Sequence, residues 1–498
     1  MMKFHVAILT LLAMLCASCG QPEAERLPPN ILWVNIDDQS PWYGTYGHEL
    51  AQTPKIDALA ETGVVFERAY APSPVCAPSR SSVITGNYNI RIGAHDMRSG
   101  RVPEYQIHLP EGATTVPELF RDAGYETYNA GKDDFNFTYQ RADLYSIRDP
   151  ELESAGGKNY KGGHGSGDWR DVPDGKPFFG QVQISGGKAV DAELPAKLEA
   201  LGYTPVNVEA VRVPPQYPDI PAVRKQIAGH YNSIMQSDHE LGQLIERLKT
   251  EGLWQNTVVI IFSDHGSDLP RSKEYLYHEG LHVPLIIAAP GMQNVVAPGS
   301  RRSDIVNLMD ISATSLALAG LDAPEYMDAE NLFADDYSRD YVFSSADRMS
   351  NVIDRVRSVM GERFHYIRNF YTDRPLMNWG YREMYGLYDP DAFSSIHVRR
   401  MYEAGELTPE QAAPYGPRVA EELYDLQTDP DEVVNLAENP EYEAVLVEMR
   451  AQLSAWIEDT DDKGQYPRSA AAMKEVTDRM PADWLKSPEF AKEPELTE

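Results

Sequence analysis

The chain has 498 residues, of which 42% are apolar, and this content is sufficient for a sizeable buried core. Its formal net charge of −31 excludes nucleic acid as a partner, because a phosphate backbone would be repelled at long range. An anionic substrate must therefore be drawn in by a local pocket of positive charge.

The first nineteen residues are typical of an export signal. Lys3 precedes an apolar run from Val6 to Leu15, and small residues follow it. This run is too short to span a bilayer as a helix, so we interpret it as a secretory signal and not as a transmembrane anchor. Cys19 stands where a bacterial lipoprotein signal carries the cysteine that accepts lipid. We expect an exported protein, tethered as a periplasmic or cell-surface lipoprotein, with free secretion as the alternative.

Beyond the signal, short apolar runs with β propensity alternate with helical patterns. This alternation predicts an α/β fold with a large doubly wound sheet, mixed or parallel, that carries helices on both faces. The longest expected helix has apolar residues at spacings of three, four and seven. In chain order we expect a strand at 30–36, a helix at 54–62, a strand at 64–66, a helix at 117–123, strands at 126–130 and 177–184, a helix at 221–250 and a strand at 257–262.

Two later segments differ in composition from the segments with alternating strand and helix patterns. The segment 156–167 is rich in glycine, with Lys158, Lys161 and His164 interleaved. This composition is typical of a mobile loop that covers a site, and equally typical of a plain surface connection. From residue 339 short strands and aromatic turns lead to a final helix at 441–457. We expect three parts after the signal: a catalytic domain at 27–335, a small-sheet α+β subdomain at 336–463 and a polar tail at 464–498.

Acidic residues end two of the expected strands, which is where the active sites of such sheets form. The first strand finishes in Asp37-Asp38, and the strand from residue 257 is followed by Asp264-His265. Adjacent ionised aspartates repel each other, so a bound cation is their natural compensation, and oxygen-rich ligands favour Ca²⁺ or Mg²⁺. The alternative for any single pair is a helix cap or a solvated turn.

Cys76 opens the run Cys76-Ala77-Pro78-Ser79-Arg80. The other two cysteines, Cys16 and Cys19, lie in or at the end of the signal, so Cys76 has no evident disulfide partner. The pattern Cys-x-Pro-Ser-Arg resembles the signature of the sulfatase family, whose fold is alkaline phosphatase-like. In that family a maturation enzyme oxidises the cysteine to formylglycine, an aldehyde whose hydrate attacks sulfur. The resemblance extends over nearly the whole exported chain.

This resemblance implies roles for residues of the present sequence. Arg80 holds the formylglycine oxygens, and Lys132 and Lys273 bind the sulfate oxygens. Ca²⁺ is the usual metal of the family, with Mg²⁺ second. The implied metal ligands are Asp37, Asp38, Asp264, His265 and the formylglycine made from Cys76.

The chain also departs from the family pattern on the side of the leaving group. Asp134 stands where a histidine usually follows the family lysine, and Lys188 stands near the strand end where a histidine often serves as the acid. Lys188 is therefore our candidate for leaving-group assistance, although the general acid stays unassigned. Arg271, His278 and His164 are weaker candidates for substrate binding.

We therefore expect a sulfuric ester hydrolase that removes sulfate from a sulfated oligosaccharide or polysaccharide. Two alternatives stay open. The first is a phosphonate or phosphate ester hydrolase of the same superfamily, because some of these enzymes also use formylglycine. The second is a catalytically inactive glycan-binding lipoprotein.

Overall fold

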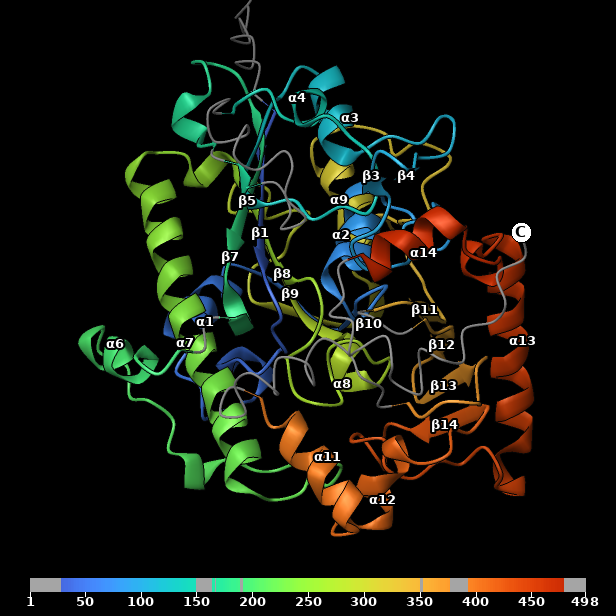
Figure 1. Ribbon diagram of the computed structural model, residues 1–498. Coiled ribbons are helices and arrows are strands. Elements are labelled where there is room, and N and C mark those ends of the chain that lie inside the picture. Colours follow the sequence, from blue (N-terminus) through green and yellow to red (C-terminus); the bar gives the residue numbers. More distant parts are fainter. Residues whose placement is uncertain are drawn as a thin grey trace, which may run out of the picture.

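The computed structural model describes residues 28–148, 164–165, 167–188, 191–349, 353–376 and 393–478. A large sheet carries helices on both faces, and a smaller sheet lies beside it (Figure 1). The expected signal and nearly all of the glycine-rich segment lie outside the described residues. Among the described residues, no helix is both long enough and apolar enough to cross a membrane.

The large sheet has eight strands in the order β10-β2-β9-β8-β1-β7-β5-β6. Strands β8, β1, β7 and β5 run parallel, so their carboxyl ends lie at one edge. Strand β9 runs antiparallel to both of its neighbours, which makes the sheet mixed. The strands are β1 (Asn30–Ile36), β2 (Gly63–Tyr70), β5 (Glu126–Lys132), β6 (His164–Gly165), β7 (Phe178–Ile184), β8 (Thr257–Ser263), β9 (His282–Ala288) and β10 (Ser300–Asn307).

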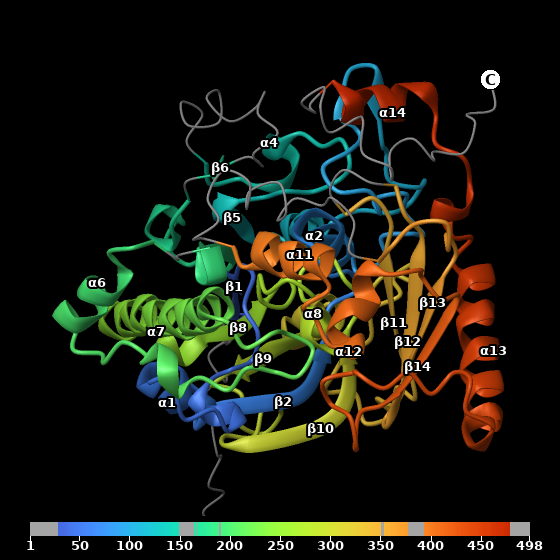
Figure 2. The same cartoon turned by 60° about the horizontal axis from the view of Figure 1, so that its bottom comes forward.

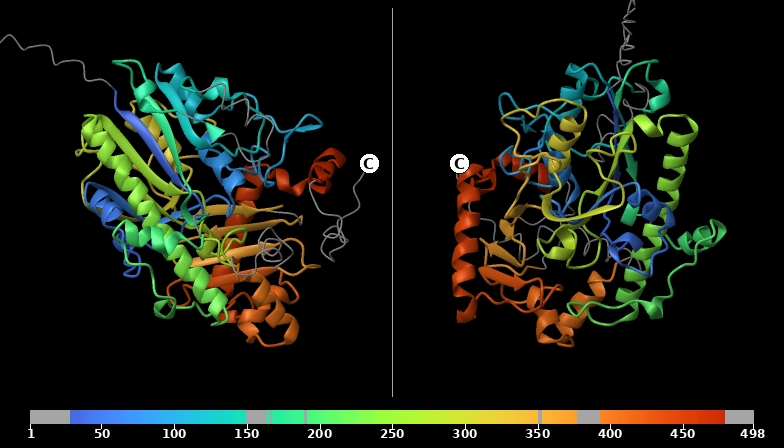
Figure 3. Two further views of the ribbon diagram at one scale, coloured as in Figure 1. Left: turned by 60° about the vertical axis from the view of Figure 1, so that its left-hand side comes forward. Right: turned by 180° about the vertical axis from the view of Figure 1, so that it is seen from behind.

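Both faces of this sheet are buried, as the continuous apolar runs predict. Alternate side chains of β1 enter two different cores, with Leu32 and Val34 in one and Ile31 and Trp33 in the other. The doubly wound α/β fold is therefore confirmed (Figure 3). The first core is covered by α1 (Pro54–Ala60), α6 (Leu194–Ala200) and α7 (Pro221–Thr250), and the second by α2 (Cys76–Thr85), α3 (Val116–Asp122) and α9 (Asp310–Leu318).

The smaller sheet is antiparallel, and together with the helix that packs on it the sheet forms a second pair of layers. Helix α13 packs on it through Leu446, Leu453 and Trp456, which share a core with Tyr366 and Leu423 of the strands (Figure 2). The division into domains at residue 335 stays a prediction. The elements of this region are β11 (Val342–Ala346), β12 (Val356–Met360), β13 (Phe364–Asn369), β14 (Glu421–Asp425) and α13 (Glu443–Asp459).

The chain after residue 463, expected to be a polar tail, contains a helix in its described part. Helix α14 (Ala470–Thr477) buries Met473, and Arg468 just before it forms an ion pair with Asp96 at 2.6 Å. This segment is therefore packed against residues from the beginning of the chain. The remaining elements are β3 (Arg101–Val102), β4 (Tyr105–Gln106), α4 (Arg141–Leu144), α8 (His278–Leu281), α11 (Ser395–Ala404) and α12 (Pro409–Ala412).

Candidate active site

Cys76 is the first residue of helix α2, which follows β2 after a short turn. Every residue of this helix is buried, so its first turn is fixed against the carboxyl edge of the large sheet. The Ser79 hydroxyl donates a hydrogen bond to the Asp264 carbonyl oxygen at 2.6 Å and ties the helix to the segment after β8. Free backbone N–H groups at a helix start favour an anion, so the fold prepares this position for a negatively charged group.

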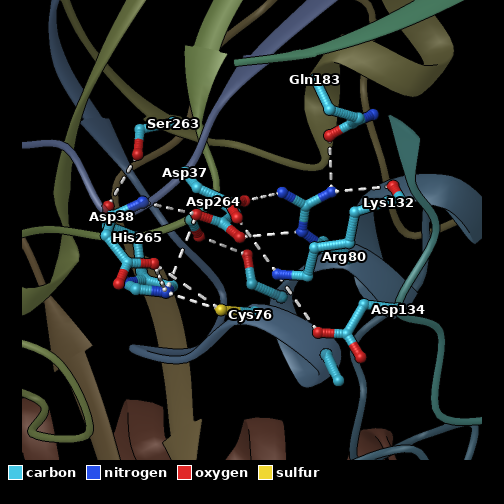
Figure 4. Close-up of polar contacts among 12 residues, drawn as sticks. Asp37, Asp38, Cys76, Arg80, Lys132, Asp134, Gln183, Ser263, Asp264 and His265 are labelled. Carbon is cyan, nitrogen blue, oxygen red and sulfur yellow. Dashed lines mark hydrogen bonds and ion pairs between the residues drawn. The ribbon is translucent and has the colours of Figure 1, made fainter. Parts of the chain in front are cut away.

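Four potential metal ligands converge at Cys76 (Figure 4). One ligand atom each from Asp38, Cys76, Asp264 and His265 lies within 4.8 Å of the others. The Cys76 sulfur is 3.2 Å from His265 Nε2 and 3.7 Å from Asp38 Oδ1. His265 Nδ1 lies 2.9 Å from the Gly266 carbonyl oxygen, which orients the ring so that Nε2 faces the cluster. Two carboxylates and an imidazole nitrogen so arranged fit a divalent cation.

Asp37, the fifth ligand expected from the sequence, lies among cations instead. Its carboxylate forms ion pairs with Arg80 and Lys188, and Lys132 Nζ lies 3.3 Å from it. Asp38 is paired with cations too, because Lys188 Nζ lies 3.1 Å from its Oδ1 and Lys273 Nζ pairs with its Oδ2. The role of Asp37 as a metal ligand stays a prediction.

Basic side chains surround the Cys76 sulfur. Lys188 Nζ and Lys273 Nζ lie 3.7 and 3.8 Å from it, and Arg80 Nε lies 2.8 Å from Asp264 Oδ2. Burial by itself raises the pKa of the Cys76 thiol. The positive charges of Lys132, Lys188 and Lys273 together outweigh burial and lower this pKa to about 6. Burial and the neighbouring Arg80 lower the pKa of Lys132 to about 8. The protein therefore concentrates positive charge here despite its strongly negative total.

Two glycines place Lys188 in this cluster. A Cβ on Gly186 would lie 2.0 Å from the Asp37 carbonyl oxygen, and one on Gly187 would lie 2.1 Å from that of Asp38. Gly186 also has a φ of +54°, which a side chain would strain. The turn after β7 can therefore lie directly on the Asp37–Asp38 backbone. This turn places the Lys188 side chain, which is 38% exposed, at the boundary between the cluster and solvent.

Gln183 is a site residue that the sequence analysis missed. Arg80 Nη1 donates to Gln183 Oε1 at 2.7 Å, and Gln183 Nε2 donates to Asn129 Oδ1 at 3.1 Å. Asn129 in turn donates to Asp133 at 2.6 Å, and Arg141 pairs with the same carboxylate through two nitrogens. This chain of contacts holds the Arg80 guanidinium. Its members come from α2, β5 and the residue after it, α4 and β7, so no local sequence pattern connects them.

Asp134, which replaces the family histidine, is a charge partner of Lys132. Its Oδ2 lies 3.2 Å from Lys132 Nζ, and its Oδ1 lies 3.7 Å from Arg98 Nε. The residue is fully buried and has a φ of +58°. A carboxylate between two cations offsets positive charge, so this position contributes to the balance of the cluster.

The three weaker candidates for substrate binding have other surroundings. Arg271 donates to the backbone carbonyl oxygens of Asp431 and Glu432 and lies over the Tyr277 ring. Arg271 and His278 line a cavity whose walls, in the described part of the chain, do not include Cys76. The backbone of His164 pairs with that of Lys132 between β6 and β5, but its side chain lies outside the described residues.

Comparisons with known proteins agree with this geometry. The sequence profile of the family described as Sulfatase matches residues 29–321. An ulvan-active sulfatase of Formosa agariphila is 28% identical over 91% of this chain and 81% of its own. The human N-sulphoglucosamine sulphohydrolase is 24% identical over 87% of this chain and 91% of its own. The solved structure of BT1596, a 2-O GAG sulfatase, superposes with a TM-score of 0.60 at 20% identity and covers 91% of this chain and 97% of its own.

Proposed function

This chain belongs to the sulfatase family and is a sulfuric ester hydrolase, and on that premise we propose that it removes sulfate from a sulfated carbohydrate with a formylglycine made from Cys76. The observation that carries the proposal is the convergence of Asp38, Asp264 and His265 on Cys76 inside a shell of basic side chains. Two relatives whose names specify ulvan and N-sulphoglucosamine support a carbohydrate substrate.

The proposal assigns one role each to the groups that complete the site. Asp38, Asp264 and His265, with the group at position 76, would hold a divalent cation, and Ca²⁺ is our proposal for it. Such a cation offsets the charge of the sulfate oxygens and makes sulfur more electrophilic. A formylglycine at position 76 supplies a hydrated aldehyde, whose hydroxyl is the nucleophile and whose second hydroxyl allows sulfate to leave.

The residues of the chain itself bind and orient the sulfate ester. Lys132 and Lys273, whose charges both act on Cys76, offer ammonium groups to the sulfate oxygens, and Arg80 fixes the carboxylates of Asp37 and Asp264. Because these cations are in place before the substrate binds, they stabilise developing negative charge without reorganisation. Lys188 lies at the solvent side of the cluster, where an alcohol would leave.

Export and maturation complete the proposed function. The N-terminal nineteen residues support export as a lipoprotein lipidated at Cys19, in the periplasm or at the cell surface. A formylglycine-generating or equivalent enzyme would act on Cys76 before folding, because this side chain is buried in the folded protein.

The mechanism is tested by mass spectrometry of the peptide that contains residue 76, in enzyme of measured activity. We expect the mass of formylglycine in the active fraction, and an unmodified thiol in fully active enzyme would refute the mechanism. Parallel assays on sulfate, phosphate and phosphonate aryl esters test the reaction class. Faster turnover of either phosphorus ester would favour the first alternative, and glycan binding without turnover would favour the second.

Leaving-group assistance by Lys188 is tested by comparing two substrates. A sugar alkoxide needs a proton donor or a cation near the bridging oxygen, whereas an activated aryl leaving group needs much less help. We expect Lys188→Ala to lower kcat by about 10²-fold on a sugar sulfate and far less on an activated aryl sulfate. Lys132→Ala is the control, because loss of sulfate binding should affect both substrates alike. Equal kcat of wild type and Lys188→Ala on the sugar sulfate would exclude this role.

A further inference from the structure

We propose that Asp134 is a positioning residue that fixes the Lys132 ammonium group within the Cys76 cluster. The inference rests on the proposed function, because that function assigns Lys132 to the sulfate oxygens. Lys132 Nζ lies 3.2 Å from Asp134 Oδ2 and 3.3 Å from Asp37 Oδ2. Figure 4 shows the two carboxylates on opposite sides of this ammonium group. Attraction from two sides restrains a flexible lysine side chain more than a single partner does.

Little water competes with these two contacts. The side chain of Lys132 is 13% exposed, that of Asp37 is 9% exposed, and that of Asp134 is fully buried. Opposite charges at such a short distance attract strongly where water is largely excluded. The Asp134 carboxylate therefore contributes to where the Lys132 ammonium group lies.

The carboxylate of Asp37 is not sufficient to hold Lys132. It also forms ion pairs with Arg80 and Lys188, so three cations share it. Without Asp134, Lys132 would compete with two other cations for this one carboxylate. Repulsion between like charges would then favour rotamers that turn the Lys132 ammonium group away from them.

The backbone and a second cation hold Asp134 in its place. Asp133, the preceding residue, accepts hydrogen bonds from Asn129 at 2.6 Å and from Arg141 Nε at 2.7 Å, which anchors the segment after β5. Asp134 has a φ of +58°, a conformation that aspartate and asparagine adopt more readily than most residues with a side chain. Its Oδ1 lies 3.7 Å from Arg98 Nε. The carboxylate is therefore held independently of its lysine partner.

Distant parts of the chain fix the segment that carries Arg98. The Met97 N–H donates to the Arg348 carbonyl oxygen at 2.8 Å, and the Gly100 N–H donates to Glu475 Oε2 at 3.0 Å. Glu475 belongs to α14, which lies in the segment that the sequence analysis expected to be a polar tail. The C-terminal helix thus supports the part of the site that carries the second cation.

The position of the Lys132 ammonium group matters more for the reaction than for binding. A positive charge attracts an anionic ester over a long distance, so a displaced ammonium group still contributes to binding. Stabilisation of the charge that develops during the reaction requires a group fixed at the right place. Loss of the Asp134 charge also removes repulsion of the ester. We therefore expect variants of Asp134 to have a lower kcat and a KM that is unchanged or lower.

The test compares kcat and KM of the wild type and of Asp134→Asn on an activated aryl sulfate. Asparagine has nearly the volume of aspartate and accepts the same φ, but it carries no charge. We expect kcat to fall about 10–100-fold without a rise in KM. Asp328→Asn is the matched control and should keep the wild-type kcat and KM, because Asp328 pairs with Arg91 at 2.9 Å outside the Cys76 cluster and its side chain is 15% exposed.

A double-mutant cycle separates positioning from a purely structural role. If Asp134 acts through Lys132, Asp134→Asn should change kcat by less than about twofold in a protein that already carries Lys132→Ala. A crystal structure of Asp134→Asn should show Lys132 Nζ displaced by about 1 Å or more. If Asp134→Asn does not fold, Asp134→Gly takes its place, because glycine adopts this φ without strain.

Four results would overturn the proposal: a wild-type kcat in Asp134→Asn, the same loss of kcat with and without Lys132→Ala, a rise in KM at unchanged kcat, or an unmoved Lys132 Nζ in the crystal structure. The crystal structure does not depend on turnover. If the wild type hydrolyses no sulfate ester, the proposed function is refuted, and the position of Lys132 Nζ still decides this inference.

Discussion

Two of the buried clusters of charged side chains in the described residues differ in composition. In the small sheet, Arg357 is fully buried and pairs with Asp347 at 2.9 Å and with Asp462 at 2.7 Å. Each acid there faces a guanidinium. At the edge of the large sheet, Asp38 pairs with Lys273 and Asp264 pairs with Arg80, but one atom of each carboxylate also lies within 4.8 Å of potential ligand atoms of Cys76 and His265.

The difference indicates what each cluster does. Mutually paired charges satisfy one another, so the Arg357 cluster joins the β11–β12 hairpin to the segment after α13. The second cluster combines ion pairs with four converging ligand atoms, one of them a thiol, and such a combination is typical of functional sites. We therefore expect variants in the first cluster to lose stability and variants in the second to lose activity.

The largest effect is expected for Asp264→Ala. It removes a proposed metal ligand and the partner of Arg80 Nε, so kcat should fall by at least about 10³-fold. The far-ultraviolet circular dichroism spectrum should stay that of the wild type. Asp459→Ala, at a side chain that is 75% exposed, is the control and should keep full activity. Residual kcat above a tenth of the wild-type value would contradict the assignment.

Arg357→Leu should have the opposite outcome. It leaves Asp347 and Asp462 buried without their main partner, so the free energy of unfolding should fall by about 3–5 kcal/mol. Activity per folded molecule should not change. Denaturant unfolding and active-site-normalised kcat measure the two quantities. Arg363→Leu removes an arginine that is 44% exposed, and should lower the free energy of unfolding much less. If both variants lowered the free energy of unfolding equally, the distinction between the clusters would be wrong.

Gln183→Leu sharpens the comparison, because Gln183 acts through Arg80 and not on the substrate. Loss of the acceptor for Arg80 Nη1 should lower kcat about 10–100-fold with little change in KM. Gln183→Glu retains an acceptor oxygen and should recover part of the loss. If both variants are equally impaired, or if only KM changes, the positioning role is wrong.

The smallest effect concerns unconverted Cys76, whose pKa differs from that of an ordinary thiol. In the folded protein, burial raises this pKa, but Lys132, Lys188 and Lys273 bring it from the ordinary 9.0 to about 6. The thiolate absorbs ultraviolet light more strongly than the thiol, so this absorbance should reach half its maximum near pH 6 in the folded protein. Because the pKa is lower in the folded than in the unfolded protein, ionisation of Cys76 stabilises the fold. This stabilisation is complete above pH 9 and is lost as the pH falls through about 6.

Unfolded protein is the control for this measurement and should show its half-maximal absorbance change near pH 9. Lys273→Ala should move the folded midpoint upward, because it removes one of the charges that stabilise the thiolate. A folded midpoint above pH 8 would show that burial outweighs the three lysines.

The sequence by itself determined the features that depend on neighbouring residues. Apolar runs and helical spacing located β1 and α7 at the bounds that the structure has, and the helix expected at 441–457 lies within two residues of α13, although α14 and not α13 is the last helix of the described residues. The run from Cys76 to Arg80 identified the chemistry, because all of its residues lie in one helical turn and a half. The acidic strand ends were visible for the same reason.

Only the tertiary structure decided which of these groups meet. The Asp38 backbone N–H donates to Asp264 Oδ1 at 3.1 Å across 226 residues of sequence, and the order of β8, β1 and β7 creates that contact. The same order brings Gln183 to Arg80, and the turn after β7 brings Lys188 to both Asp37 and Asp38. A local pattern specifies the direction of a strand and its buried faces, but contacts between distant strand ends depend on sheet order, which no local pattern contains.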